Sequence, residues 1–452
     1  MEPTSSAIPS ASWHALPNEM KLAVIDALDA EDVKALSKVD QLTYQACVPA
    51  QFRKVKLDSY EALERFLENV PRSYCSYIEE LELCTQSETA HFLPVLPRVR
   101  ADSVITLLLA SPAISKLVLK VAGSLDKSVL TPFPYLNNLK QLSISNCGDE
   151  QRTPLSERFV VYMAASIRNL EELFLDRITR SQLHAPELEG AYPCVPLAMN
   201  DEDIPDHPVL GSELSLPSLL QIPTLHKLTI RDTHLGHSGW TTTPVACRLQ
   251  VLDIGSCYHE DEGFNTRCTE RIMAAVGPTV DEFSLTAAVS DSVFSKPSAT
   301  PLQRLRKLHI SPYFPVDSVV ETMSNLAGSP VEGISVQCFE EDVVDVCTAL
   351  EEFLSLRVER GPEFYHRLQR IDVSVAADDD GMTPTQEERE ERIQAARRLQ
   401  ELCRDLQLAS VVDKFDKFAA AVATKMGGSG NAGPISFTDA RRYPAKGRSM
   451  TL

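Results

Sequence analysis

The sequence has no long apolar run and is poor in basic residues. Its 452 residues include 44 Lys and Arg against 63 Asp and Glu, a formal net charge of −19. A chain this acidic repels phosphate backbones, so we expect no nucleic-acid partner. No apolar run reaches the ~20 residues of a membrane-spanning helix, and the N-terminus MEPTSSAIPSASW lacks the features of a secretory signal. We therefore expect no membrane contact.

Paired cysteines of the CxxC type are also absent. The eleven cysteines are scattered and odd in number, which fits reduced thiols in the cytoplasm or the nucleus. One loose group of metal-ligating types occurs, and its spacing matches no standard zinc pattern: His234, His237, Cys247, Cys257 and His259. We expect no metal and no other cofactor.

Motifs of catalysis are missing as well. The sequence contains no GxSxG elbow, Walker loop, HExxH or EF-hand loop. A GxGxxG at Gly428–Gly433 follows an Ala-rich run and precedes Pro434, so it predicts a linker and not a dinucleotide site. We expect a binding protein with no enzymatic activity. An enzyme whose site is assembled from distant residues is the weaker alternative.

What the sequence does contain is one phrase repeated ten times. In each copy an aliphatic residue is followed by two variable residues and then by two apolar residues with one variable residue between them. This alternation is typical of a strand with one buried face. The phrase begins at Ile78, Ile114, Leu139, Leu170, Leu225, Leu249, Val280, Leu305, Val331 and Leu368. Most of the intervals lie near the ~20–29 residues of leucine-rich repeats.

Helical patterns separate these phrases. They show apolar residues three and four apart behind a polar first residue, and lie at 158–167, 269–276, 317–326 and 342–350. Strand followed by helix predicts an α/β leucine-rich-repeat solenoid, a parallel β-sheet with outer helices, over residues 58–377. An ordinary α/β domain with short parallel strands is the alternative.

The first sixty residues have a different character. Apolar residues at helical spacing are punctuated by Pro17, Asp29 and Asp40, which suit the starts of three short helices. The string LPNEMKLAVIDALDAEDVKALSKVDQLTYQACVPAQFRKVKL resembles an F-box, over residues 13–57. It departs from many F-boxes at Asp40-Gln41, where these carry Cys-Arg.

Together with the repeats, this segment makes the chain similar to F-box and leucine-rich-repeat proteins of the divergent fungal type. The resemblance implies a substrate receptor that joins a Skp-family adaptor and cullin complex to a protein target in the cytoplasm, the nucleus or both. The implied adaptor-binding residues are Leu16, Pro17, Met20, Ile25, Leu28 and Leu36. A non-catalytic repeat scaffold with no role in ubiquitin ligation is the alternative.

Three further segments stand out. An acidic, Pro-rich insertion at about 183–217 interrupts the repeats and is typical of an exposed loop. Residues 378–410 predict a charged helix that caps the solenoid. Residues 1–12 and 411–452 have the composition of disordered ends.

The outward positions of the repeat strands are the candidate target-binding residues. Solenoids present these positions side by side on one face. The candidates are Phe174, Asp176, Arg231, Asp253 and His309. A large aromatic such as Phe174 on a strand is a plausible hot spot. The acidic insertion is the competing surface, and it would favour a basic target.

Overall fold

The computed structural model describes residues 13–87, 97–255, 257–289, 302–361, 363–376 and 385–412. The chain divides into two compact units, Met1–Leu219 and Leu220–Leu452, a division that falls inside the predicted solenoid. The terminal segments 1–12 and 413–452, with the GxGxxG, lie outside the described residues. Within the described part of the chain, no helix is long and apolar enough to cross a bilayer.

The first unit begins with the three short helices that the sequence predicts. They follow the 3-10 turn η1 (Trp13–Ala15) and are α1 (Asn18–Ala27), α2 (Ala30–Leu36) and α3 (Gln41–Phe52). The Asp29 side chain accepts a hydrogen bond from the Asp32 amide at 2.8 Å, and Asp40 accepts one from the Thr43 amide at 2.9 Å. Both aspartates therefore cap the helices that follow them, as their positions predict.

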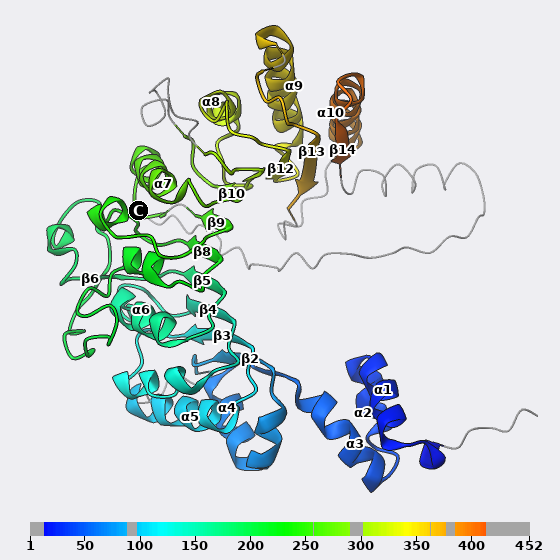
Figure 1. The fold of residues 1–452 in the computed structure, drawn as a ribbon, viewed down its shortest axis with the longest axis vertical. Coiled ribbons are helices and arrows are strands. Elements are labelled where there is room, and N and C mark those ends of the chain that lie inside the picture. The colour runs from blue at the N-terminus through cyan, green and yellow to red at the C-terminus, as the bar shows by residue number, and fades with distance from the viewer. Residues whose placement is uncertain are drawn as a thin grey trace, which may run out of the picture. The chain divides into compact units, whose positions relative to one another are not determined.

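A parallel sheet follows in the same unit. Its strands pair in chain order as β1 (Lys54–Leu57), β2 (Glu80–Cys84), β3 (Lys116–Val121), β4 (Gln141–Asn146) and β5 (Glu172–Asp176). Figure 1 shows α4 (Tyr60–Asn69), α5 (Pro97–Ala110) and α6 (Glu157–Ser166) on one side of these strands. Short 3-10 turns connect them: η2 (Arg72–Tyr77), η3 (Lys127–Leu130) and η4 (Phe133–Tyr135).

The insertion closes the first unit. It contains a two-stranded parallel sheet, β6 (Arg180–Ser181) with β7 (Leu197–Ala198), and the 3-10 turn η5 (Pro186–Leu188). The turn η6 (Leu216–Gln221) ends it.

The second unit repeats the architecture with seven parallel strands in chain order. They are β8 (Lys227–Arg231), β9 (Val251–Ile254), β10 (Glu282–Leu285), β11 (Lys307–Ile310), β12 (Gly333–Cys338), β13 (Arg370–Val375) and β14 (Ala409–Val412). Its helices and turns are η7 (Ser238–Thr241), α7 (Glu262–Val276), η8 (Val316–Ser318), α8 (Val319–Asn325), α9 (Val343–Arg360) and α10 (Gln386–Asp405).

The repeat prediction is confirmed. Each of the ten phrases contains one strand, and its first aliphatic residue is at most 4% exposed. The apolar strand positions stack across the sheet, with Leu142 opposite both Leu117 and Leu173. Ten apolar residues at the alternate positions of five phrases are at most 3% exposed: Leu142, Ile144, Leu173, Leu175, Leu228, Ile230, Leu252, Ile254, Leu308 and Ile310. The chain is thus an α/β leucine-rich-repeat fold.

Two further strands lie outside the ten repeated phrases. Residues 54–57, assigned to the helical segment 13–57, form β1 and pair with β2. Residues 409–412, at the predicted border between the capping helix and the tail, form β14 and pair with β13. One strand therefore precedes the first phrase, and another follows the last.

Asn146 explains why the chain turns where it does after β4. The side chain is fully buried, and its Oδ1 accepts hydrogen bonds from the amides of Gly123 at 3.2 Å and Gly148 at 2.9 Å. Its Nδ2 donates to the Thr153 carbonyl at 3.0 Å. The side chain thereby satisfies backbone groups that leave the sheet, which is the role that leucine-rich repeats give this position.

Truncation of one stacked leucine tests the packing. Leu252 is fully buried in β9, so we expect Leu252→Ala to lower the free energy of unfolding by ~2–5 kcal/mol through lost contacts and a cavity. Urea unfolding measures the change. The matched control is Val358→Ala on α9, whose side chain is 59% exposed and should cost less than ~0.5 kcal/mol. Equal costs would contradict the core assignment.

Candidate functional site

The three-helix segment is a small bundle with a small core. Ile25, Val33 and Cys47 form that core and are at most 4% exposed. Several partly buried residues pack against it: Trp13, Leu28, Leu36, Ala46 and Ala50. The Trp13 indole N–H also donates to the Thr43 hydroxyl at 2.9 Å, which ties the start of the chain to α3.

The six residues that the resemblance assigns to adaptor binding therefore divide into two groups. Pro17 and Met20 are exposed, Met20 by 54%, and Leu16 is half-buried. Leu28 and Leu36 pack against the core. Ile25 is 1% exposed and belongs to the core, so it is not available to an adaptor in this conformation.

The bundle also exposes apolar side chains that the sequence interpretation missed. Val39 and Leu42 are 64% and 72% exposed, and Leu22 and Val24 on α1 are 44% and 42% exposed. A core of three residues can bury only part of the apolar material on three helices. The surplus on α1 was visible in the sequence, because Met20, Leu22 and Val24 cannot all face one side of a helix.

Aromatic contacts join the bundle to the first repeat. The Phe52 ring, at the end of α3, lies 5.2 Å from the Tyr74 ring and 6.3 Å from the Phe66 ring, centroid to centroid. Arg53 reaches back to Asp26 on α1 at 2.7 Å. The helices are thus attached to the repeats through packing on α4 and η2.

The candidate residues on the strand face are largely engaged already. In the first unit Phe174 is half-buried, and Asp176 lies 3.7 Å from the Arg177 guanidinium. In the second unit the Arg231 guanidinium donates to the Asp253 carboxylate at 2.6 Å. The sequence placed Arg231 and Asp253 among outward residues, and the structure brings them together as an ion pair.

His309 is engaged in the same way. Its Nε2 lies 2.8 Å from the Glu282 carboxylate, and Lys307 approaches the same carboxylate at 3.4 Å. The pKa of Glu282 falls to about 2, chiefly because of the hydrogen bond with His309, while partial burial opposes the shift. The carboxylate is therefore ionised and paired at neutral pH.

The insertion is not the exposed loop that its composition predicts. Ala185, Ala198, Ile204, Leu210 and Leu214 are at most 9% exposed, so this segment has an apolar underside. The prediction was wrong because composition reports polarity, whereas the structure buries about every third residue between 195 and 210 and leaves most of the others exposed.

A buried carboxylate anchors the insertion. Glu157, the first residue of α6, is fully buried, and its Oε1 accepts from Arg180 Nε at 2.9 Å and from the Ser181 amide at 3.1 Å. Its Oε2 accepts from the Leu216 amide at 3.1 Å. His184 Nδ1 lies 3.4 Å from Oε1. One side chain thus holds both ends of the insertion.

The electrostatics of this group follow from its partners. Burial alone would raise the pKa of Glu157, but the Arg180 guanidinium and the His184 ring outweigh burial and hold the pKa at about 2. Arg180 is 1% exposed, so the pair is enclosed on both sides. The carboxylate is therefore charged at neutral pH.

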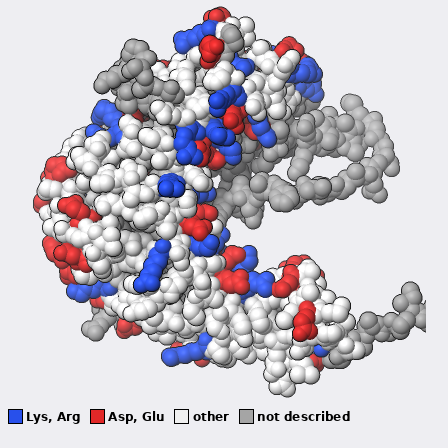
Figure 2. All heavy atoms as spheres, viewed as in Figure 1, with Lys and Arg blue, Asp and Glu red and all other residues white. Residues whose placement is uncertain are grey.

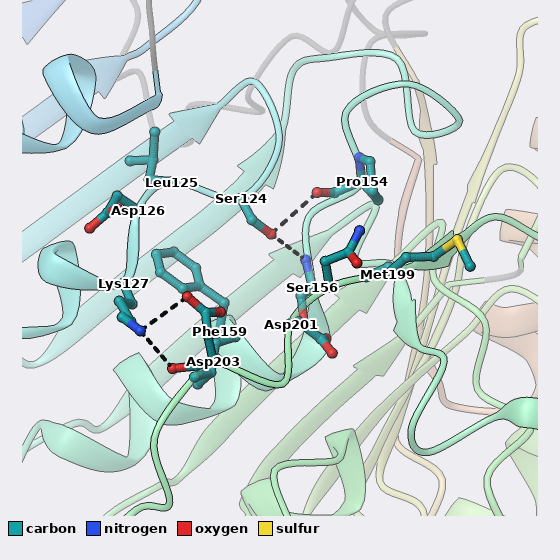
Figure 3. A pocket seen from close by; sticks show the side chains of 13 residues that line it. Ser124, Leu125, Asp126, Lys127, Pro154, Ser156, Phe159, Met199, Asp201 and Asp203 are labelled. Atoms are coloured by element: carbon teal, nitrogen blue, oxygen red, sulfur yellow. Dashed lines mark hydrogen bonds and ion pairs between the residues drawn. The ribbon is translucent and has the colours of Figure 1, made fainter.

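A second buried carboxylate fastens the middle of the insertion. Asp201 is 6% exposed and accepts from the Ser156 hydroxyl at 2.5 Å and from the Ser181 hydroxyl at 2.9 Å. Beside it lies a polar pocket of about 240 Å³, drawn in Figure 3. At its rim the Lys127 ammonium pairs with the Asp203 carboxylate at 3.2 Å, which bridges η3 and the insertion.

The loose group of histidines and cysteines forms no metal centre. His234 pairs with Glu260 at 3.2 Å, and its ring packs on Phe264 at 4.9 Å between centroids. Among the residues that the structure describes, no cluster of three or more His, Cys, Asp or Glu side chains could hold a metal ion.

The comparisons with known proteins add little to this. The sequence matches no known protein family and no curated protein. Among solved structures the chain is similar to one described as the crystal structure of a TLR13–ssRNA13 complex, with 14% identity and a TM-score of 0.31. The alignment covers 71% of this chain and 39% of that chain. So distant a likeness carries no argument, and the repeat fold rests on strand pairing and core packing.

Replacement of the anchoring carboxylate tests how the insertion is held. Glu157→Gln leaves the buried Arg180 without its counter-charge, so we expect the insertion to open more easily, by ~3–5 kcal/mol. Hydrogen exchange at the Gln182 amide, which donates to the Ala198 carbonyl at 3.0 Å, measures this opening. The control is Glu171→Gln, whose partner Lys140 is exposed and whose loss should cost less than ~1 kcal/mol.

The same pair predicts a pH dependence. The pKa of Glu157 lies below its ordinary value of 4.5, at about 2 in the fold, so its stabilising contribution is complete above 4.5. It is lost as the pH falls towards 2. The difference in Gln182 protection between the parent chain and Glu157→Gln should therefore shrink below pH 4.5. A difference that stays constant down to pH 2 would contradict the assignment.

Proposed function

We propose that this chain is the substrate-recognition subunit of a cullin-type E3 ubiquitin ligase. Helices α1–α3 dock on a Skp-family adaptor, and the repeat-bearing part of the chain holds a protein target. The proposal builds on the resemblance of residues 13–57 to an F-box and on three short helices that begin at the predicted caps.

The apolar surface of the bundle is the observation that carries the proposal. Met20, Leu22, Val24, Val39 and Leu42 are between 42% and 72% exposed on a segment of about forty residues. Full burial of one such side chain against a partner contributes up to ~1.5–3 kcal/mol to the free energy of binding. A bundle without a partner lacks this contribution. Met20 and Val24 lie one turn apart on α1, so an adaptor that covers this side of the helix supplies part of it.

In this role the chain makes and breaks no covalent bonds. It holds the target close to the ubiquitin-transfer machinery, which raises the effective concentration of the reacting groups. Proximity of this kind needs two separate binding surfaces and no reactive side chain. Such a complex works in the cytoplasm, the nucleus or both.

A repeat scaffold without a role in ubiquitin ligation is the second candidate. The Phe52 contacts with Tyr74 and Phe66 favour it, because they show the bundle packed on the first repeat as a terminal cap would be. The two candidates differ in one measurable property, which is affinity for an adaptor.

Charge placed on the exposed apolar surface tests the proposal. We expect Met20→Glu with Leu42→Glu to weaken binding of the full chain to a purified Skp-family adaptor at least a hundredfold, since two buried apolar contacts are replaced by buried charges. Leu16→Ala with Pro17→Ala should weaken binding in the same direction. Isothermal titration calorimetry measures the affinity, and circular dichroism checks the fold.

The matched control is Val358→Glu, which adds a charge to an exposed apolar position outside the bundle and should leave the affinity unchanged. An adaptor that does not bind the parent chain, or binds the double variant equally well, would overturn the receptor proposal in favour of the scaffold.

A further inference from the structure

We propose that the insertion, residues 183–217, is the surface that docks the target, and that the target presents a segment in which basic and apolar side chains are interleaved. This inference deepens the proposed function and rests on it, because it names the chemistry of the protein that the receptor would hold.

The insertion exposes large apolar side chains. Leu183, Tyr192, Met199 and Val209 are 49%, 98%, 55% and 80% exposed. Single exposed apolar residues are ordinary on a protein surface, but four on one ordered segment of this length are not. They supply apolar contacts that a partner can bury.

The formally charged residues within the insertion itself have one sign. No Lys or Arg occurs between Ser181 and Leu219. Six acidic residues there are exposed: Glu187, Glu189, Glu202, Asp203, Asp206 and Glu213. Figure 2 shows Asp and Glu side chains gathered on the side where Figure 1 places β6. A partner that fits this surface carries positive charge.

The pocket beside the insertion has the same character. Of its thirteen lining residues, Asp126, Asp201 and Asp203 are acidic and Lys127 is basic. Met199 also lines the pocket, and in Figure 3 its side chain extends away from Asp201. The pocket volume of about 240 Å³ accommodates one long side chain. Asp203 already pairs with Lys127 at 3.2 Å, so a basic side chain from the target would replace Lys127 as its partner there.

The surface is held in place before any partner arrives. Glu157 fixes Arg180 and the Leu216 amide, and Asp201 is fixed by Ser156 and Ser181. His207 packs edge-on against Tyr162 of α6, with 5.0 Å between ring centroids. An ordered backbone loses little conformational entropy on binding, so the exposed side chains are free to contribute affinity.

The strand face offers less to a target. Its charged candidates pair with one another, as Arg231 with Asp253 at 2.6 Å and His309 with Glu282 at 2.8 Å. A ligand that recruits them must first break these pairs. In the insertion, Glu187, Glu202 and Asp206 are exposed, and a ligand can reach them without first breaking such a pair.

A synthetic peptide serves as the probe. It is fluorescein-labelled, fifteen residues long, and alternates arginine with leucine and phenylalanine, and a second peptide replaces every arginine by glutamine. We expect the full chain to bind the arginine peptide at least tenfold more tightly than the glutamine peptide. Binding should weaken as salt rises from 50 to 300 mM, because exposed charges are screened. Fluorescence anisotropy measures both.

Two variants locate the binding. The charge variant is Glu187→Gln, Glu189→Gln, Glu202→Gln and Asp206→Asn, and the apolar variant is Met199→Ser with Val209→Ser. Each should weaken arginine-peptide binding at least fivefold. The matched charge control changes four exposed acids elsewhere, Glu68, Glu352, Glu359 and Glu387, to Gln, and the apolar control is Tyr135→Ser, whose side chain is 67% exposed. Both controls should bind as the parent chain does.

Equal weakening by the variants and their controls would overturn the docking inference, since binding would then follow net charge alone. So would equal affinity for the two peptides. Adaptor binding, measured on the same variants, separates this inference from the proposed function. Loss of peptide binding in the insertion variants with intact adaptor binding supports both, whereas a parent chain that binds the peptide and no adaptor overturns the receptor proposal alone.

Discussion

Burial of aliphatic side chains at alternate strand positions is the constraint on which the rest of the structure depends. A strand of four to six residues has too little apolar surface to be stable alone, so each repeat must stack on its neighbours. The stack at Leu117, Leu142 and Leu173 shows how this works, because equal register places like side chains side by side. The same register turns the intervening side chains outward. Within the repeats, the side chains available to a partner are therefore those at the outward positions and on segments inserted between repeats.

The outward positions are governed by electrostatics. Neighbouring strands lie ~4.8 Å apart, so a charge on one strand meets a charge on the next. The pairs Lys54 with Glu80, Arg231 with Asp253 and His309 with Glu282 satisfy these charges between adjacent strands. The arrangement keeps a highly charged face compatible with a close-packed sheet. The paired groups are less available to a partner than the exposed side chains of the insertion and the bundle.

How much of this was predictable depends on the sequence distance over which each feature is determined. The repeats and the helix starts were predictable, because each phrase carries its own alternation and each capping aspartate lies three residues before the amide that donates to it. β1 and β14 were not, since Lys54–Leu57 and Ala409–Val412 lack the phrase and become strands by pairing with a neighbour. Ile25 shows the limit in the bundle: helical spacing identifies apolar residues but does not separate core from surface. The contact that anchors the insertion was the least predictable from the sequence, because Glu157 and Leu216 lie 59 residues apart.

That anchor also explains why an acidic, proline-rich segment has a defined place. Removal of Glu157 and Arg180 from water costs several kcal/mol per ion, and their attraction only offsets this cost when the remaining polar groups are satisfied. The Ser181 and Leu216 amides complete the shell of the carboxylate. Apolar residues of equal volume would hold the segment with similar strength but would accept several registers. The Glu157 carboxylate needs the Arg180 guanidinium and the Ser181 and Leu216 amides, so it is compatible with a single register of the segment. The buried pair thus favours the conformation in which Ala198 and Ile204 are buried while Met199 and Glu202 are exposed to solvent.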